Sequence, residues 1–176
     1  MTVRPCRRLF VLRHAKSAWP PDVADHERPL APRGRRDAPA AGRWLRAADC
    51  LPERVLCSTS LRTRQTWALA APELGGAVPP VAYEPRLYRA TLPELFDVLR
   101  EVPDDVGALL CVGHNPGLQE LVLALAGEDL AGARGQVEEK FPSAAIAVLT
   151  WHGPWRDLAP GAALLTDVAV PRGGKA

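Results

Sequence analysis

The chain of 176 residues has the length of one domain, because single cores typically grow to about 100–200 residues before a chain divides. Its 47% hydrophobic and 24% charged residues exclude a disordered chain, and a net charge of +2 is too small to indicate general binding to nucleic acid or a membrane surface. Only three of the 22 basic residues are lysines. Arginine therefore dominates, and its planar fork suits phosphate or carboxylate oxygens.

No segment approaches the roughly 18 apolar residues that cross a bilayer, and the arginine-rich start, residues 3–13, lacks the apolar stretch of a signal peptide. We expect a cytoplasmic protein that binds neither a membrane nor nucleic acid. The four cysteines have no CxxC spacing, so neither a structural zinc site nor a disulfide framework is expected: Cys6, Cys50, Cys57 and Cys111.

Short apolar runs alternate with amphipathic or alanine-rich segments along the chain. Strands are predicted at residues 8–12, 55–57, 81–83, 108–112, 144–151 and 162–170, and helices at 33–48, 61–71, 92–102 and 118–125. Pro39 and Gly42 are expected to shorten or kink the first helix. The proline-rich stretch 19–32 should be an irregular loop, and the tail 172–176 should be frayed.

Strands that alternate with helices and are apolar on both faces predict a three-layer α/β/α sandwich with a mostly parallel sheet. No repeat, linker or low-complexity tract divides the sequence, so residues 1–176 are predicted to form a single domain. In such folds ligands bind beyond the carboxyl ends of the strands.

Three of these predicted strand ends carry residues suited to phosphate. Arg13 and His14 follow the first strand, Arg62 lies in the first turn of the helix after the second, and His114 follows the most apolar strand. Each alone is more simply explained as a solvated charge or a turn residue. Together at one sheet edge they favour a phosphate pocket. A histidine there can act as a nucleophile while arginines hold the oxygens of the group it attacks.

These residues resemble the motifs of the histidine phosphatase superfamily, whose fold is like that of the phosphoglycerate mutases. Its Arg-His-Gly motif stands here as Arg13-His14-Ala15, its second arginine motif as the segment 58–66, and its second histidine motif as Gly113 to Pro116. Ser17 and Trp19 match the usual continuation, whereas Pro20 replaces an asparagine that contacts phosphate in many members. The short length and the segment 28–37 look most like SixA-type phosphohistidine phosphatases.

The resemblance implies a metal-independent phosphatase without a cofactor. His14 would attack phosphorus and form a phosphohistidine intermediate, and Arg13, Arg62 and His114 would stabilise the phosphoryl oxygens. Ser17 and Asn115 are expected to help bind the substrate, a phosphorylated protein or a small phosphorylated molecule.

Larger relatives have a glutamate shortly after the third strand that protonates the leaving group. The matching place here falls near Arg89, which is not an acid, and Glu84 is the nearest candidate general acid. A solvated loop charge is the simpler interpretation of Glu84. The lack of a general acid at this place favours phosphohistidine as the substrate, because an imidazole that is already protonated leaves phosphorus readily.

Several other residues are expected to be ordinary. His26 and His152 are interpreted as structural or solvated histidines, and the loop acids Asp22, Asp25 and Glu27 as solvated charges. Four tryptophans are predicted to lie in the core or at its rim: Trp44, Trp67, Trp151 and Trp155.

Two alternatives remain open at this stage. One is a phosphatase or mutase for small phosphate esters on the same scaffold, although the segment 84–107 leaves little chain for the lid that a mutase needs. The other is a non-catalytic phosphate- or RNA-binding module, which would tolerate replacement of His14 and show strong salt dependence.

Overall fold

The computed structural model describes residues 4–175, so Val3 at the predicted arginine-rich start and Ala176 of the predicted tail lie outside it. Within that range seven strands form one sheet in the order β3-β2-β4-β1-β6-β7-β5. The strands are β1 (Cys6–Arg13), β2 (Arg54–Ser58), β3 (Val81–Glu84), β4 (Ala108–Gly113), β5 (Ala126–Asp129), β6 (Ile146–His152) and β7 (Ala163–Ala169). The helices are α1 (Pro32–Ala47), α2 (Leu61–Ala70), α3 (Leu92–Arg100), α4 (Gly117–Leu125) and α5 (Ala133–Glu139).

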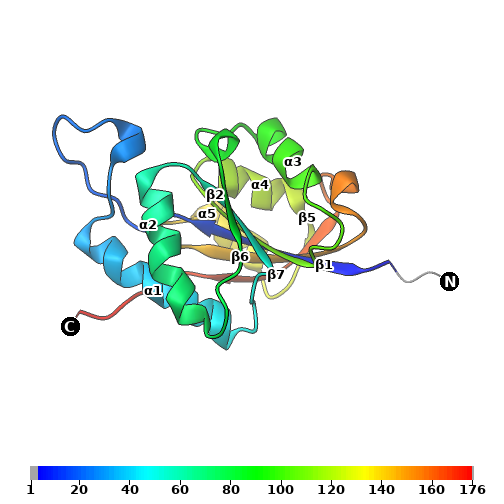
Figure 1. Ribbon diagram of the computed structural model, residues 1–176. Coiled ribbons are helices and arrows are strands. Elements are labelled where there is room, and N and C mark those ends of the chain that lie inside the picture. Colours follow the sequence, from blue (N-terminus) through cyan, green and yellow to red (C-terminus); the bar gives the residue numbers. More distant parts are fainter. Residues whose placement is uncertain (1–3, 176) are drawn as a thin grey trace.

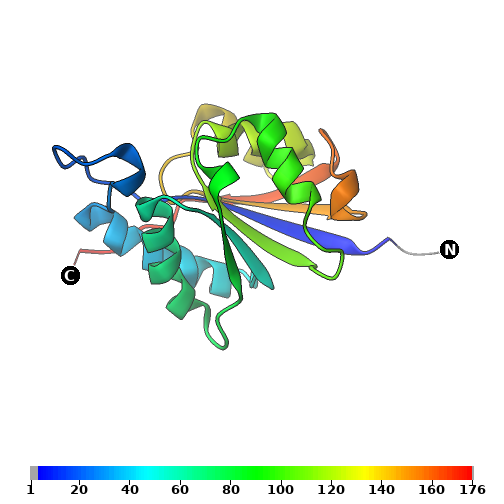
Figure 2. The same cartoon turned by 45° about the horizontal axis from the view of Figure 1, so that its top comes forward.

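Helices cover both faces of the sheet (Figures 1 and 2). Alternation along β1 explains why: Leu9 and Val11 join a core cluster with residues of α3, α4 and α5, whereas Phe10 and Leu12 join a second cluster with residues of α1 and α2. A strand that is buried on both sides needs a helical layer on each, so the predicted three-layer sandwich is confirmed.

The sheet is parallel over β3, β2, β4 and β1 and again between β7 and β5, but β6 runs antiparallel to both of its neighbours. The predicted mostly parallel sheet is therefore confirmed, with one reversed strand. The polar sequence that follows α4 forms β5 and α5, which were not predicted. Neither element has a continuous apolar run, and the other strand predictions rest on such runs.

Helix α1 is not interrupted at its internal proline and glycine. It continues through Pro39 and Gly42 to Ala47, and a Cβ on Gly42 would lie 2.2 Å from the Ala70 carbonyl oxygen. Gly42 therefore lets α1 pack closely on α2 and does not interrupt the helix. The predicted shortening is wrong.

The tail that was predicted to be frayed is held against α1 at its first two residues, Arg172 and Gly173. Arg172 pairs with Asp37 of α1, and the Gly173 amide donates to the same carboxylate. Trp67, Trp151 and Trp155 are buried and Trp44 packs against the core, as predicted. No helix within residues 4–175 is both long and apolar enough to cross a membrane.

Candidate active site

The carboxyl ends of β1, β2 and β4, three neighbouring strands, place the predicted site residues side by side. Arg13 ends β1 and pairs in register with Gly113, which ends β4. His14 and His114 follow directly, and the amide of His14 donates to the Gly113 carbonyl at 3.0 Å. Arg62 enters from the first turn of α2, after β2. The four predicted residues line one cavity of about 780 Å³.

His14 is held as a neutral imidazole with a defined tautomer. Its Nδ1 lies 2.8 Å from the Ala15 carbonyl oxygen, and because a carbonyl only accepts, Nδ1 carries the proton and Nε2 keeps its lone pair. The side chain is 8% exposed. Burial, and then the charges of Arg62, Arg13 and Arg28, lower the pKa of His14 to about 3, although the Ala15 carbonyl opposes this shift. Near neutral pH the ring is uncharged, and a neutral imidazole with a lone pair on Nε2 has the form that a histidine nucleophile requires.

The two arginines of the site are positioned by their outer nitrogens. Arg13 donates from Nη1 to the Phe141 carbonyl, and Arg62 donates to the Asp25 carbonyl oxygen at 2.6 Å and to the Asp25 carboxylate at 3.2 Å. The Nε atoms of Arg13 and Arg62 are buried and have no hydrogen-bond partner among residues 4–175. Buried donors are normally satisfied, so both are suited to an anionic ligand.

His114 is oriented by the end of β2. Its Nε2 lies 2.8 Å from Ser58 Oγ, and Ser58 Oγ also accepts from the Ser60 amide. We assign the hydroxyl proton to the bond with Nε2, which leaves the imidazole proton on Nδ1. That Nδ1 is also buried without a partner in the described part of the chain. Burial, followed by the His14 and Arg62 charges, lowers the pKa of His114 to about 3.

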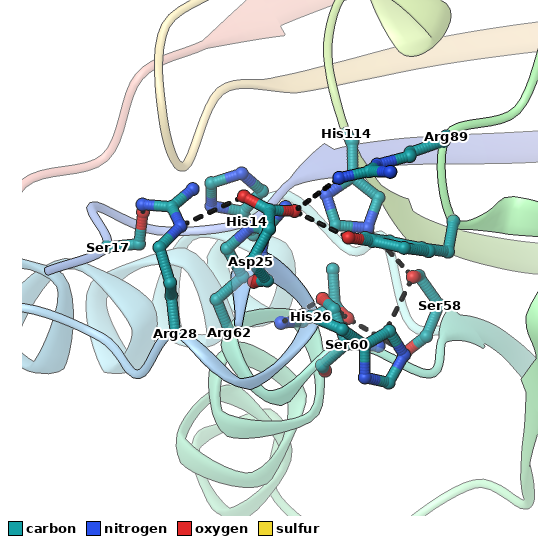
Figure 3. A network of polar contacts seen from close by, with 12 residues as sticks. His14, Ser17, Asp25, His26, Arg28, Ser58, Ser60, Arg62, Arg89 and His114 are labelled. Carbon is teal, nitrogen blue, oxygen red and sulfur yellow. Dashed lines mark hydrogen bonds and ion pairs between the residues drawn. The ribbon is translucent and has the colours of Figure 1, made fainter. Parts of the chain in front are cut away.

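Asp25 contacts the arginines of the candidate site, and the sequence interpretation missed it. Its carboxylate accepts from Tyr88 Oη at 2.6 Å, from Arg62 and from Arg28 Nε at 3.1 Å, and it lies between Arg28 and Arg89 (Figure 3). The Tyr88 hydrogen bond and these arginines hold the pKa of Asp25 well below its usual value. Its interpretation as an ordinary solvated charge is therefore wrong. Only the folding of the proline-rich loop over α2 brings it to Arg62.

Ser17 and Asn115 both line the cavity, as expected for substrate-binding residues, but their polar atoms are engaged. Ser17 Oγ accepts from Arg28 Nη1 at 2.9 Å. Asn115 donates from Nδ2 to the Phe141 carbonyl at 2.8 Å and accepts from the Gln119 amide. Asn115 thus anchors the segment that Arg13 also contacts.

Glu84 lies apart from the cavity lining. Its carboxylate accepts from both Nε and Nη2 of Arg86, and this hydrogen bonding lowers the pKa of Glu84. A carboxylate that an arginine fork keeps ionised is a poor proton donor. The contacts of Glu84 argue against its candidate role as general acid.

The other two histidines, His26 and His152, do not line this cavity. His26 contacts Thr59 and Glu27, in keeping with a structural role, and His152 is exposed on β6. Among residues 4–175, no three His, Cys, Asp or Glu side chains gather closely enough to hold a metal ion.

The motifs, the fold and the cavity together define a histidine phosphatase domain, and comparison with known families agrees. Residues 9–89 match the model of the histidine phosphatase superfamily, branch 1. The chain belongs to this superfamily.

Solved structures of proteins described as SixA share this fold. A proposed phosphohistidine phosphatase SixA from Nakamurella multipartitia is 35% identical, with a TM-score of 0.84 over 97% of this chain and 99% of that one. A protein histidine phosphatase SixA solved with tungstate shares the fold at a TM-score of 0.75 and 23% identity, covering 93% and 97% of the two chains. An uncharacterised protein of Mycobacterium tuberculosis is 46% identical over 164 residues, 92% of this chain and all of that protein.

Proposed function

We propose that the protein is a phosphohistidine phosphatase that hydrolyses the N–P bond of phosphohistidine on a protein and needs no metal. One observation carries the proposal. Arg13, Arg62 and His114, each with a buried donor that has no protein partner in residues 4–175, line the cavity that also holds the neutral imidazole of His14. Donors fixed in advance around a nucleophile are what a phosphoryl group requires, because charge spreads over its oxygens during transfer.

In the first step His14 Nε2 attacks phosphorus. An Nε2–P bond forms while the bond from phosphorus to the substrate imidazole breaks, and that bonding pair stays on the departing nitrogen. When the other nitrogen of the departing ring already holds a proton, the ring leaves as neutral imidazole. The protein then needs no general acid, in keeping with the surroundings of Glu84.

In the second step water hydrolyses the intermediate. A P–O bond forms, the Nε2–P bond breaks with its electron pair returning to His14, and the proton of the water is lost to solvent. The Ala15 carbonyl keeps Nδ1 of His14 protonated throughout, which fixes the ring orientation. Ser17, held by Arg28, and the segment anchored by Asn115 shape the wall of the cavity.

The substrate assignment draws on two further points. Glu84, the candidate general acid for an alkoxide leaving group, is bound to Arg86 and lies outside the cavity lining, and the similar Nakamurella multipartitia protein is a proposed phosphohistidine phosphatase. A phosphatase of small phosphate esters on the same fold is the main alternative.

A substrate panel separates these functions. It compares a phosphohistidine peptide, a phosphoserine peptide, sugar phosphates and 3-phosphoglycerate, each with and without EDTA. We expect the highest kcat/KM for phosphohistidine and no loss of activity with EDTA. A higher kcat/KM for an alkyl ester would overturn the substrate assignment, and activity restored only by an added divalent cation would overturn metal independence.

A further inference from the structure

The cavity is lined by more than the proposed phosphoryl-binding residues. Four further cationic residues line it, which we call the outer cationic end: Lys16, Arg33, Lys140 and Arg172. None of these belongs to the proposed catalytic group. A volume of about 780 Å³ lies in the roughly 300–1,000 Å³ range of pockets that enclose whole small molecules. A single phosphoryl group would fill only part of it.

A buried carboxylate organises this end. Asp37 of α1 is 1% exposed, and it pairs with Arg33 Nε at 3.4 Å and with Arg172 Nη1 at 3.3 Å. The Gly173 amide donates to the same carboxylate at 3.0 Å. Asp37 therefore holds one arginine from α1 and one from the C-terminal segment at the same place.

The backbone of the C-terminal segment is also closely packed. A Cβ on Gly173 would lie 2.1 Å from the Arg36 carbonyl oxygen, so only glycine allows this approach to α1. Arg172 Nη1 donates further to the Ser143 carbonyl at 3.0 Å. Both cartoon views place the segment beside α1 (Figures 1 and 2). The position of Arg172 at the cavity is thus fixed by several contacts.

Arg33 and Arg172 both retain N–H groups that Asp37 does not occupy. Their side chains are 51% and 35% exposed, for Arg33 and Arg172 respectively. Asp37 contacts one nitrogen of each, and its single charge balances only one of the two guanidinium groups. Seven cationic side chains and one carboxylate, that of Glu139, line the cavity, and Asp25 and Asp37 pair with four of the arginines from outside the lining. Such a concentration of one charge attracts anions and raises their local concentration.

We propose that the outer cationic end binds a second anionic group on the same substrate molecule, with Arg33 and Arg172 as its main contacts. The proposal rests on the proposed function, because it takes the phosphoryl group to be bound at His14. The second group is a carboxylate or a phosphate. It comes either from acidic residues beside a phosphohistidine in a protein or from a second phosphate on a small molecule.

The test compares Arg33→Gln, Arg172→Gln and the double variant with Arg35→Gln. Arg35 is an exposed arginine two positions from Arg33 on the same helix and does not line the cavity. The substrates are phosphoramidate, phosphohistidine peptides with acidic or neutral flanks, and a small bisphosphate with its monophosphate counterpart. Thermal unfolding confirms that each variant is folded.

We expect the double variant to raise KM for one class of two-anion substrate about tenfold more than KM for phosphoramidate. An effect on the acidic peptide assigns the second anion to a protein, and an effect on the bisphosphate assigns it to a small molecule. Equal changes for one-anion and two-anion substrates, or the same selective change in Arg35→Gln, would overturn the proposal. Failure of wild-type protein to hydrolyse phosphoramidate or any phosphohistidine would instead overturn the proposed function.

Discussion

The imidazole rings of His14 and His114 lie 5.3 Å apart between centroids and are tilted by 57°. The adjacent strands β1 and β4 bring them together, since the residue before each ring pairs in register, Arg13 with Gly113. The two rings differ in the proton that each is assigned. His14 keeps a lone pair on Nε2 because its Nδ1 faces the Ala15 carbonyl, whereas we assign the His114 proton to Nδ1 because Nε2 faces Ser58 Oγ. In the proposed mechanism the residue after one strand supplies the nucleophile, and the residue after the other supplies a donor for the group that it attacks.

The tautomer of His114 should depend on Ser58. Without the hydroxyl, the imidazole proton is free to move to Nε2, and the phosphoryl oxygens lose a fixed donor. We expect Ser58→Ala to lower kcat/KM about tenfold, as for a charge-assisted hydrogen bond. Nitrogen NMR of the histidine rings should change from the Nδ1–H form to a mixture.

Thr59→Ala is the matched control, because Thr59 lies in the same turn but contacts His26. A Ser58→Ala protein that keeps the Nδ1–H signal and full activity would rule out the positioning role of Ser58.

Removing the charge of Asp25 should make bound phosphate more stabilising. Arg62 is buried, and in Asp25→Asn it loses its anionic partner. Because about a third of the Asp25 side chain is exposed, we expect a loss of about 1 kcal/mol, or about 2–4 °C in Tm. Inorganic phosphate should replace the lost charge and raise Tm more in the variant than in wild type.

Asp22→Asn, a change at an exposed acid of the same loop, serves as the control. Equal phosphate stabilisation of wild type and Asp25→Asn would show that Asp25 does not balance the charge of Arg62.

Acid should destabilise the protein through the two active-site histidines. Their pKa is about 3 in the folded protein and about 6.5 in an unfolded chain. Between these values the unfolded chain binds more protons, so the free energy of unfolding falls as pH falls below about 6.5. The slope should reach about 1.4 kcal/mol per pH unit for each histidine.

Denaturant unfolding between pH 7 and pH 5 measures this slope. His14→Gln combined with His114→Gln should flatten it, whereas His152→Gln, at an exposed position on β6, should leave it unchanged. An undiminished slope in the double variant would assign the acid sensitivity to other groups.

The sequence predicted the position of His14 well because a buried strand, local in sequence, determines it. Arg13, Arg62 and His114 follow the same logic at neighbouring strand ends. Asp25 and Arg172 escaped prediction because their contacts join residues far apart in the chain, Asp25 with Arg62 and Arg172 with Asp37. Residue periodicity within one segment does not predict contacts between distant segments.

The rate of hydrolysis should depend steeply on the pKa of the leaving group. Glu84 should not contribute to this dependence. Aryl phosphates with a low leaving-group pKa are expected to react much faster than alkyl phosphates, because no carboxylic acid donates a proton. Glu84→Gln should change these rates less than about twofold, since its carboxylate is bound to Arg86 outside the cavity. A shallow dependence that Glu84→Gln makes steep would establish Glu84 as a working general acid.

The central claim is that His14 becomes phosphorylated during turnover. Mixing the enzyme rapidly with a phosphohistidine peptide and quenching into alkaline denaturant preserves an N–P bond, and mass spectrometry locates it. We predict phosphate on His14 in wild type and in His26→Ala, none in His14→Ala, and at least a thousandfold loss of turnover in His14→Ala, on the order seen when a covalent nucleophile is removed. Phosphate on another residue, or turnover of His14→Ala within about tenfold of wild type, would contradict the claim.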